Sequence, residues 1–256
     1  MNDATQTILV SVIMPVYNGA RFVEAAIRSV IGQTHTNWEL IVIDDGSADG
    51  TCAIVERLAE QDPRIRLYRN PRNMGVAHTR NRGFSLCTGA YVALLDGDDI
   101  WFPEKLELQL QLARETGAEL IYCSYQIVDE NTQPICDDFI VPESTDFRDS
   151  LTRSVMSCST TLLSSTITQH YRFDPQYYHE DLVLWLQLLR DGYQARGVTQ
   201  VCAQYRVMKG SRASNKLRTA LRRWEVYRGF LGLSPVKAFA LMVRYALLGF
   251  KKYKAI

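Results

Sequence analysis

Two short apolar runs in this 256-residue chain each end in a cluster of carboxylates. The run ELIVI at 39–43 leads into DDGS at 44–47, and the run YVALL at 91–95 leads into DGDD at 96–99. Continuous apolar runs of about five residues, bounded by Gly and Asp, are typical of strands buried on both faces of a parallel sheet. Such sheets bind ligands at the carboxyl ends of their strands. Because clustered acids repel one another, we expect a cation between them, most simply a divalent metal ion that carries a phosphorylated substrate.

Strand-like and helix-like segments alternate through the first half of the chain, which predicts βαβ units and a mostly parallel sheet. We expect strands at 9–14, 39–43, 65–68, 91–95, 120–125 and 198–207, with helices that include 73–86 and 182–189. The helix after the second strand is expected to begin near Ser47 as its N-cap. The mixed, polar stretch 136–150 is expected to form a mobile loop over the site.

The charge of the chain is unevenly distributed along its length. Residues 206–256 carry 13 Lys and Arg but a single acid, Glu225, for a net charge of +12, whereas residues 1–205 have a net charge of −11. A hydrophobic content of 46% is enough for one large domain or for a domain with an appendage. We expect a domain over 1–209 and a basic, amphipathic, helical appendage over 210–256, and basic tails favour anionic partners.

This basic tail contains a helical pattern with two separate rows of side chains. One row is basic and the other is apolar: Lys237, Arg244 and Lys251, and then Phe239, Val243, Leu247 and Phe250. Such a helix can lie in a membrane interface with its cations on anionic head groups. The alternative is a helix packed on the body with a solvated basic side, and nucleic-acid binding by the tail is the weakest interpretation.

Several signals indicate a protein that stays inside the cell. The six cysteines are scattered without a C-x-x-C pair, so we interpret them as reduced thiols and not as disulfides or zinc ligands. No basic stretch precedes the first apolar run at Ile8, which argues against a signal peptide. No segment reaches about 18 uninterrupted apolar residues, the length that a membrane span needs. We expect a cytoplasmic protein, with peripheral contact at the inner face of the plasma membrane.

The turn after the first strand offers aromatic and amide groups where nucleotide-binding enzymes often have a glycine-rich loop. Neither G-x-G-x-x-G nor G-x-x-x-x-G-K-[ST] occurs there, which argues against an NAD-binding domain and against a P-loop enzyme. Tyr17 could stack on a nucleobase, Asn18 adds an amide, and a carboxylate after the second strand could accept from a base N–H. Adjacent strand residues point to opposite faces, so we expect only one of Asp44 and Asp45 to enter the site.

Six motifs follow one another between about residues 8 and 207. They are VIMPVYN at 12–18, DDGS at 44–47, N-x-G at 73–75, A-x-x-R-N-x-G at 77–83, DGDD at 96–99 and ED at 180–181. Their order and spacing resemble the motif series of the family 2 glycosyltransferases. The resemblance implies an α/β fold of the GT-A type, a nucleotide-sugar-binding sandwich of helices about a mostly parallel central sheet, followed by a C-terminal helical appendage.

The resemblance also implies a role for each matched residue. The metal ion, Mn²⁺ or Mg²⁺, is expected on Asp98, with Asp96 supporting the ribose or the metal, and hard oxygen ligands suit these ions. The substrate-binding positions that match are Pro15, Tyr17, Asn18, Asp45, Arg80, Asp96 and Glu180. Among them Pro15, Tyr17 and Asp45 correspond to base-binding positions and Arg80 to a phosphate contact.

Asp181 is expected to be the catalytic base. Inverting transfer needs a carboxylate that takes the acceptor hydroxyl proton, and the start of a helix stabilises its charged form. Many relatives have a histidine where this chain has Met208, so we expect no metal ligand from that position.

The expected activity is metal-dependent, inverting transfer of a hexosyl or N-acetylhexosaminyl group from a nucleotide sugar, with UDP as the favoured nucleotide, to an acceptor hydroxyl. The resemblance implies an acceptor in capsule, O-antigen or exopolysaccharide assembly, including one linked to polyprenyl diphosphate. A nucleotidyltransferase is one alternative, but it usually needs a glycine-rich, basic loop that residues 15–19 do not provide. A non-catalytic nucleotide-sugar-binding or carbohydrate-binding protein of the same fold is the other, and we would expect it to have lost the metal or base acids.

Overall fold

The computed structural model describes residues 7–208 and 216–252, with the backbone alone described at 216–220 and 249–252. The strands are β1 (Val10–Val16), β2 (Trp38–Asp44), β3 (Ile65–Arg69), β4 (Tyr91–Leu94), β5 (Ile100–Trp101), β6 (Leu120–Val128), β7 (Ser144–Thr145), β8 (Leu162–Ser164) and β9 (Ala195–Arg206). The α-helices are α2 (Val23–Ile31), α3 (Thr51–Gln61), α4 (Val76–Leu86), α5 (Lys105–Thr116), α6 (Phe147–Ser150), α7 (Ser165–His170), α8 (Glu180–Arg190), α9 (Lys216–Glu225) and α10 (Pro235–Lys252). A 3₁₀ turn, η1 (Cys158–Thr160), and a π-helical turn, η2 (Val226–Phe230), complete the described elements.

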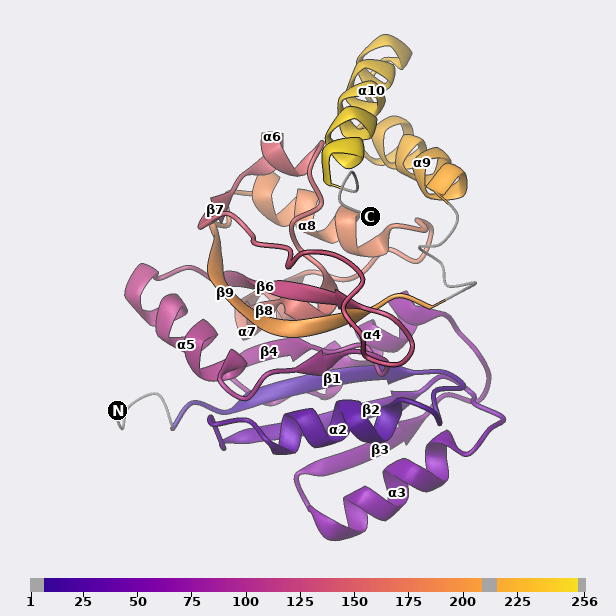
Figure 1. Ribbon diagram of the computed structural model, residues 1–256, viewed down its shortest axis with the longest axis vertical. Helices are drawn as coiled ribbons and strands as arrows, with labels where there is room; N and C mark the ends of the chain where they lie inside the picture. Colours follow the sequence, from indigo (N-terminus) through magenta and orange to yellow (C-terminus); the bar gives the residue numbers. More distant parts are fainter. Residues whose placement is uncertain (1–6, 209–215, 253–256) are drawn as a thin grey trace.

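The strands of the described chain form one nine-stranded sheet in the order β3-β2-β1-β4-β8-β6-β9-β5, with β7 beside β9 (Figure 1). The first four strands along this order are parallel to one another, and β6 is parallel to β9. Strand β8 joins the two groups and is antiparallel to both β4 and β6. The expected mostly parallel sheet is therefore confirmed, with antiparallel pairs confined to β5, β7 and β8.

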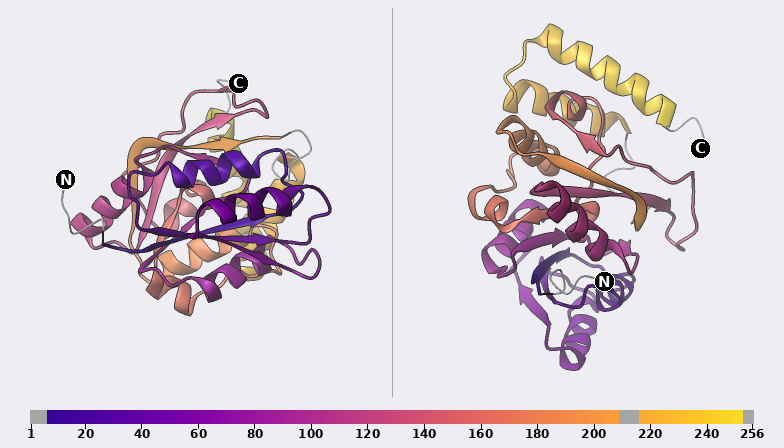
Figure 2. Two further views of the ribbon diagram at one scale, coloured as in Figure 1. Left: turned by 90° about the horizontal axis from the view of Figure 1, so that it is seen from below. Right: turned by 90° about the vertical axis from the view of Figure 1, so that its left-hand side faces the viewer.

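The central strands are mostly apolar because helices cover both faces of the sheet (Figure 2, left). Every residue of β1 and β2 is buried. Val12 and Met14 belong to a core that includes α2, α3 and α5, whereas Ile13 between them belongs to a second core with α4, α7 and α8. Successive strand side chains point to opposite faces, so both of them meet a hydrophobic layer.

The neighbouring strands β2, β1 and β4 end at the same edge of the sheet. Val16 at the end of β1 pairs with Asp44 at the end of β2, and Ile13 of β1 pairs with Leu94 at the end of β4. The turns that follow these three strands therefore lie side by side. This is the edge at which the sequence predicted the ligand site.

The helix that follows β2 begins later than the sequence suggested. Its N-cap is Gly50 and not Ser47. The hydroxyl of Ser47 instead accepts a hydrogen bond at 2.8 Å from the backbone N–H of Asn18. Ser47 is thus used to join the first two turns at the sheet edge, and the expectation that it caps α3 was wrong.

The segment 136–150 is not a loop over the site. Phe139 forms a bridge with Tyr125 of β6, Val141 is buried, and β7 pairs with β9. Helix α6 then follows, with its first turn capped by the side chain of Asp146. Because this segment packs along β6 and β9, none of its residues lines the large cavity described below.

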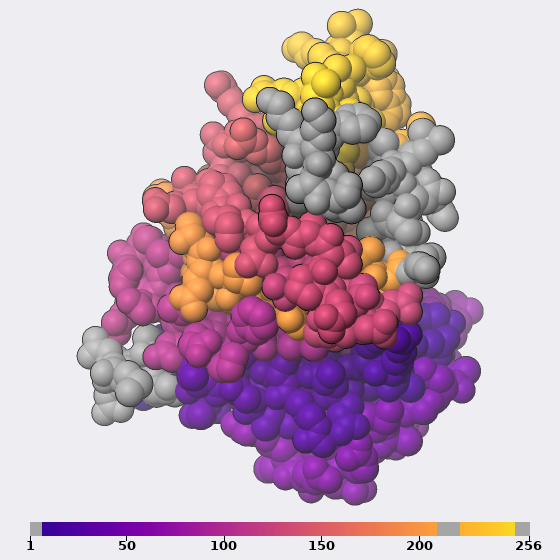
Figure 3. Space-filling view, in the orientation of Figure 1, coloured from indigo at the N-terminus to yellow at the C-terminus, as the bar shows by residue number. Residues whose placement is uncertain are grey.

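The C-terminal helices lie at the end of the molecule opposite α3 (Figure 1; Figure 3). Arg223 of α9 is buried and donates to the carbonyls of Ser150 and Leu151, and Val226 of η2 shares a core with residues of α8. Part of the expected appendage is therefore packed on the rest of the protein. The expected boundary after residue 209 lies outside the described residues and stays a prediction. None of the described helices combines the length and the apolar character needed to cross a membrane.

Candidate active site

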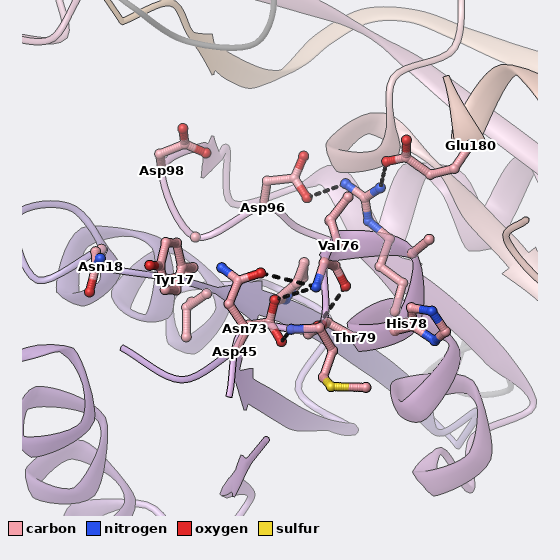
Figure 4. Close-up of a pocket in the computed structure, with 18 of the residues that line it drawn as sticks. Tyr17, Asn18, Asp45, Asn73, Val76, His78, Thr79, Asp96, Asp98 and Glu180 are labelled. Carbon is pink, nitrogen blue, oxygen red and sulfur yellow. Dashed lines mark hydrogen bonds and ion pairs between the residues drawn. The ribbon is translucent and has the colours of Figure 1, made fainter. Parts of the chain in front are cut away.

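A cavity of about 710 Å³ opens at the carboxyl edge of the sheet, over the ends of β1, β2 and β4. Eight of the nine site residues expected from the sequence line it (Figure 4): Pro15, Tyr17, Asn18, Asp45, Arg80, Asp96, Asp98 and Glu180. The ninth, Asp181, is not among the lining residues. The fold therefore gathers groups that are up to 165 positions apart in the sequence into one site.

The turn after β1 presents an aromatic ring to this cavity. Tyr17 is 53% exposed, so its ring is accessible to a ligand. Asn18 has a positive φ of 48°, a conformation that Asn adopts more readily than most residues. Its side-chain oxygen accepts from the backbone N–H of Ala48 at 2.9 Å. The amide of Asn18 therefore holds the turns after β1 and β2 together at the cavity wall.

The two acids at the end of β2 have separate positions. Both are buried, but only Asp45 lines the cavity, and the Oδ2 of Asp44 accepts from the backbone N–H groups of Gly46 and Ser47. The choice of Asp45 as the residue at the cavity therefore agrees with its placement.

The carboxylate of Asp45 also binds the loop that precedes α4. Its Oδ1 accepts from the backbone N–H of Met74 and its Oδ2 from that of Gly75, each at 2.9 Å, and Oδ1 also accepts from the side chain of Asn70 at 2.7 Å. These bonds fix the loop 73–75 that leads into α4. Asp45 thus shapes the cavity wall in addition to facing it.

Arg80 forms ion pairs with two acids that come from different halves of the chain, Asp96 and Glu180, both labelled in Figure 4. Its NH2 group is 2.6 Å from Oδ1 of Asp96, and its NH1 group is 3.0 Å from Oε1 of Glu180. Burial by itself lowers the pKa of Arg80, but the charges of Asp96 and Glu180 outweigh that effect and hold the pKa well above its ordinary value. The guanidinium therefore stays charged and links the β4 turn to the start of α8.

The position of Arg80 changes how the negative charges of Asp96 and Glu180 are compensated. From the sequence we expected a metal ion to offset these acids, and the family resemblance assigned Arg80 to a phosphate contact. In the structure the terminal nitrogens of Arg80 bond to two carboxylates, so part of the compensating charge comes from the protein itself.

Asp98 is the acid of the β4 turn that lines the cavity beside Asp96 and takes no part in the two Arg80 ion pairs. Burial and the neighbouring charge of Asp96 raise the pKa of Asp98 to about 6. Asp99 is fully enclosed, and its Oδ1 accepts from the backbone N–H of Arg206 at 2.8 Å. The Nε of Arg206 also donates to the backbone carbonyl of Asp98 at 2.8 Å. Arg206 thus fixes the turn and leaves the Asp98 side chain at the cavity.

The chemistry of these acids fits a hard divalent ion. No group of three or more His, Cys, Asp or Glu side chains in the described part of the chain is arranged to hold a metal. A Mg²⁺-type site commonly uses one or two protein carboxylates and completes its shell with substrate phosphates and water. Asp98, with Asp96 beside it, offers such a partial set, and its raised pKa indicates a carboxylate that a nearby cation would stabilise.

The two acids at the start of α8 are placed differently. Glu180 is buried, lines the cavity and is bonded to Arg80. Asp181 is partly exposed, and its Oδ1 accepts from the backbone N–H of Leu182 at 2.7 Å. The Oε1 of Glu180 is committed to the Arg80 cation, whereas the Oδ1 of Asp181 is bonded to a neutral backbone N–H. The catalytic role of Asp181 stays a prediction.

Other cavity residues were not expected from the sequence. Pro175 and Tyr177, from the segment before α8, and His78 and Thr79 of α4 also line the cavity. Asn73 belongs to the N-x-G motif at 73–75, for which no role was expected, and it also lines the cavity. No local pattern distinguishes 175–177, because these residues reach the site only through the packing of α8.

Comparison with known proteins gives a consistent set of similarities. The sequence profile described as "Glycosyl transferase family 2" matches residues 11–159. The chain is 36% identical to the putative teichuronic acid biosynthesis glycosyltransferase TuaG of Bacillus subtilis, over 95% of this chain and 97% of that protein. It is 35% identical to the UDP-Glc:alpha-D-GlcNAc-diphosphoundecaprenol beta-1,3-glucosyltransferase WfgD of Escherichia coli, over 96% of this chain and 95% of that protein.

Solved structures share the fold at low sequence identity. Residues 1–349 of Staphylococcus aureus TarS in complex with UDP-GlcNAc superimpose with a TM-score of 0.71 at 17% identity, covering 95% of this chain and 73% of that chain. The mannosyltransferase PcManGT of Pyrobaculum calidifontis, in complex with GDP-Man and Mn²⁺, gives a TM-score of 0.69 at 20% identity, covering 93% of this chain and 69% of that one. These similarities confirm the expected GT-A architecture.

Proposed function

The chain belongs to glycosyl transferase family 2 and is a glycosyltransferase, and on that premise we propose that it transfers a sugar from a UDP-sugar to an acceptor hydroxyl with inversion at the anomeric carbon. The observation that carries this proposal is the convergence of Tyr17 and Asp45, Asp98, and Glu180 on one cavity. These residues supply an aromatic face, an acidic metal-type position and an acid-lined wall at the edge where α/β sheets bind ligands.

The donor is proposed to lie across the ends of β1, β2 and β4. The uracil would stack on Tyr17, with Asp45 near its N–H groups and Pro15 beside it. The diphosphate would lie near Asp98, because Asp96 and Asp98 repel each other and a cation bound between them would also bind the phosphates. A Mn²⁺ or Mg²⁺ ion held by Asp98 and Asp96 would offset the charge of the departing nucleoside diphosphate.

Arg80 is proposed to act near the diphosphate of the donor. Its guanidinium pairs with both Asp96 and Glu180, and these two bonds hold the acids at the cavity. The family resemblance assigns Arg80 to a phosphate contact, and the positive field of this buried guanidinium supports a role near the diphosphate.

Asp181 is proposed to take the proton from the acceptor hydroxyl as that oxygen bonds to the anomeric carbon and the carbon–oxygen bond to the diphosphate breaks. The commitment of Glu180 to Arg80 supports Asp181 over its neighbour. Asp181 also belongs to the first turn of α8, where the helix dipole stabilises a negative charge.

The acceptor is proposed to be a saccharide linked to a polyprenyl diphosphate in surface-polysaccharide assembly. The named activities of the Escherichia coli and Bacillus subtilis relatives support this class. Since the lipid part of such an acceptor lies in a bilayer, we also propose peripheral contact with an anionic membrane through the C-terminal helices. The setting that follows is the inner face of the plasma membrane.

The experiment that tests the donor is a panel of nucleotide sugars incubated with the full-length protein and Mn²⁺ or Mg²⁺, scored by release of nucleoside diphosphate. We expect release from a UDP-sugar and its loss in excess EDTA. Equal release with EDTA would contradict the metal assignment, and release from only GDP-sugars or dTDP-sugars would contradict the choice of nucleotide.

A further inference from the structure

Helix α10 exposes a row of large apolar side chains. Val236, Phe239, Val243 and Leu247 are 79%, 63%, 43% and 61% exposed, and we refer to these four residues as the apolar stripe. Their spacing of three, four and four residues places them on one side of the helix. A continuous row of this kind, on a helix that projects from the end of the molecule (Figure 3), is typical of an interaction surface.

The other sides of α10 have different characters. On the side facing the body, Ala238 is buried and the ring of Tyr245 lies 4.1 Å from the guanidinium carbon of Arg223. Lys237 and Arg244 are exposed and seven residues apart, so they form a basic row beside the apolar stripe. Phe250 and Lys251, which the sequence assigns to the same two rows, lie outside the residues whose side chains are described. The helix thus packs on the body through the side that carries Ala238 and Tyr245, while the apolar stripe and the basic row are exposed to solvent.

The charge around the apolar stripe selects the partner. Residues 235–252 contain no acid, and the chain from 206 onward carries 13 Lys and Arg against Glu225 alone. A second copy of the same surface would bring two basic rows together. An anionic bilayer offers instead an apolar interior for the stripe and negative head groups for the basic row. We propose that α10 docks on an anionic lipid bilayer, with the apolar stripe in the interface and the basic row against the head groups.

Contacts of η2 link this helix to the active site. Tyr177, on the cavity wall, packs edge to face against Phe230 with 6.1 Å between ring centroids. Val226 packs on Leu182 and Leu186 of α8, the helix that begins with Glu180. The orientation of α10 is therefore coupled to the wall that contains the start of α8. This inference rests on the proposed function, because docking would bring that wall close to a lipid-linked acceptor.

The test is co-sedimentation of the full-length protein with vesicles of phosphatidylcholine alone or mixed with phosphatidylglycerol, at low and high salt. We expect binding to the mixed vesicles that weakens with salt. The variant Phe239→Ser/Val243→Ser/Leu247→Ser should bind the mixed vesicles at least about tenfold more weakly than the wild type, since interfacial affinity scales with buried apolar area. Lys237→Gln/Arg244→Gln should also lose on the order of tenfold, and its residual binding should be less sensitive to salt.

The matched control is Ile140→Ser. This residue is 57% exposed, and it lies in the segment between β6 and β7, outside the apolar stripe. It should bind vesicles as the wild type does. Since all the substituted side chains are exposed, circular dichroism and thermal unfolding should be unchanged in each variant.

Each outcome separates docking from catalysis. Failure of the intact protein to bind mixed vesicles, or unchanged binding by the stripe variant, would overturn the docking proposal. A dimer in light scattering that the stripe variant abolishes, without vesicle binding, would assign the surface to a second copy of the chain and also overturn it. Vesicle binding as expected, with no sugar transfer to any acceptor, would leave docking supported and contradict the proposed function.

Discussion

Replacing Asp98 with asparagine should change stability and activity in opposite directions. Asp98 lies beside Asp96, and burial together with that charge raises its pKa from 3.8 to about 6. The folded protein therefore disfavours the charged carboxylate. Asparagine has nearly the same shape without the charge, so Asp98→Asn should stabilise the metal-free protein at neutral pH while it abolishes metal-dependent transfer.

The size of the effect follows from the pKa change. A shift of about two units corresponds to about 3 kcal/mol in the free energy of unfolding at a pH above both pKa values. Asp98 keeps some contact with solvent, so we expect a gain of about 1 to 2 kcal/mol, or about 2 to 8 °C in Tm for a chain of this size. The folded state binds the extra proton between pH 4 and 6. The advantage of the variant should therefore be full above about pH 6 and disappear below about pH 4.

The assay is thermal unfolding of both proteins with EDTA and then with excess Mn²⁺. An ion that binds only the folded state stabilises it, by about 2.7 kcal/mol at a concentration one hundred times Kd, so Mn²⁺ should raise the Tm of the wild type. The same ion should have little effect on Asp98→Asn. The control is Asp137→Asn, an exposed site outside the cavity, which should follow the wild type in both conditions.

This reasoning fails if Asp98→Asn is less stable than the wild type with EDTA at neutral pH. It also fails if Mn²⁺ raises the Tm of the variant as much as that of the wild type. The first result would contradict a destabilising repulsion between Asp96 and Asp98, and the second would show that the metal binds to other ligands.

Three further predictions concern the base, the β2 turn and a buried lysine. Asp181→Asn should lower turnover by about two to four orders of magnitude while calorimetry still detects UDP-sugar binding. If Asp181→Asn is active and Glu180→Gln is inactive, the base is Glu180 and this assignment is wrong. Gly46→Ala should lower the free energy of unfolding in urea by about 1 to 3 kcal/mol, because φ is +81° and a Cβ would lie 2.7 Å from the carbonyl carbon of Arg72; an unchanged midpoint would contradict this. Burial lowers the pKa of Lys105 from 10.5 to about 8, so the unfolded state binds more protons between these values. The wild type should therefore gain stability from pH 8 to pH 10 relative to Lys105→Met, and parallel curves for the two proteins would refute this.

The parts of the fold that were predictable are those set by local pattern. Residues 40–43 and 92–95 are apolar because α2 and α4 lie on opposite faces of the sheet, so a continuous apolar run identified a buried parallel strand. Parallel strands end at one edge, and the acids that follow these two runs therefore had to lie together. The alternation of strand side chains likewise separated Asp44 from Asp45.

Contacts between distant segments were beyond such reasoning. Arg80 and Glu180 are 100 positions apart, and nothing in the sequence near either residue indicates that they form a buried ion pair. The bond from Asn18 to Ser47 is another such contact, and it removed Ser47 from the helix cap that local rules suggested. The polar stretch 136–150 appeared to be a loop because its few apolar residues, such as Val141, are buried by β6 and β9 and not by one another.

The measurement that tests the central claim most directly is the structure of the product. The full-length protein would be incubated with UDP-glucose, with other UDP-sugars in parallel, and with an N-acetylglucosaminyl-diphospho-lipid acceptor and Mn²⁺, and the anomeric configuration of the new linkage would be read by NMR. The account predicts a β linkage from an α-linked UDP donor, one UDP released for each sugar transferred, and no product in EDTA. An α linkage would contradict the inverting mechanism, and the absence of product from every UDP-sugar with this acceptor would contradict the proposed transfer.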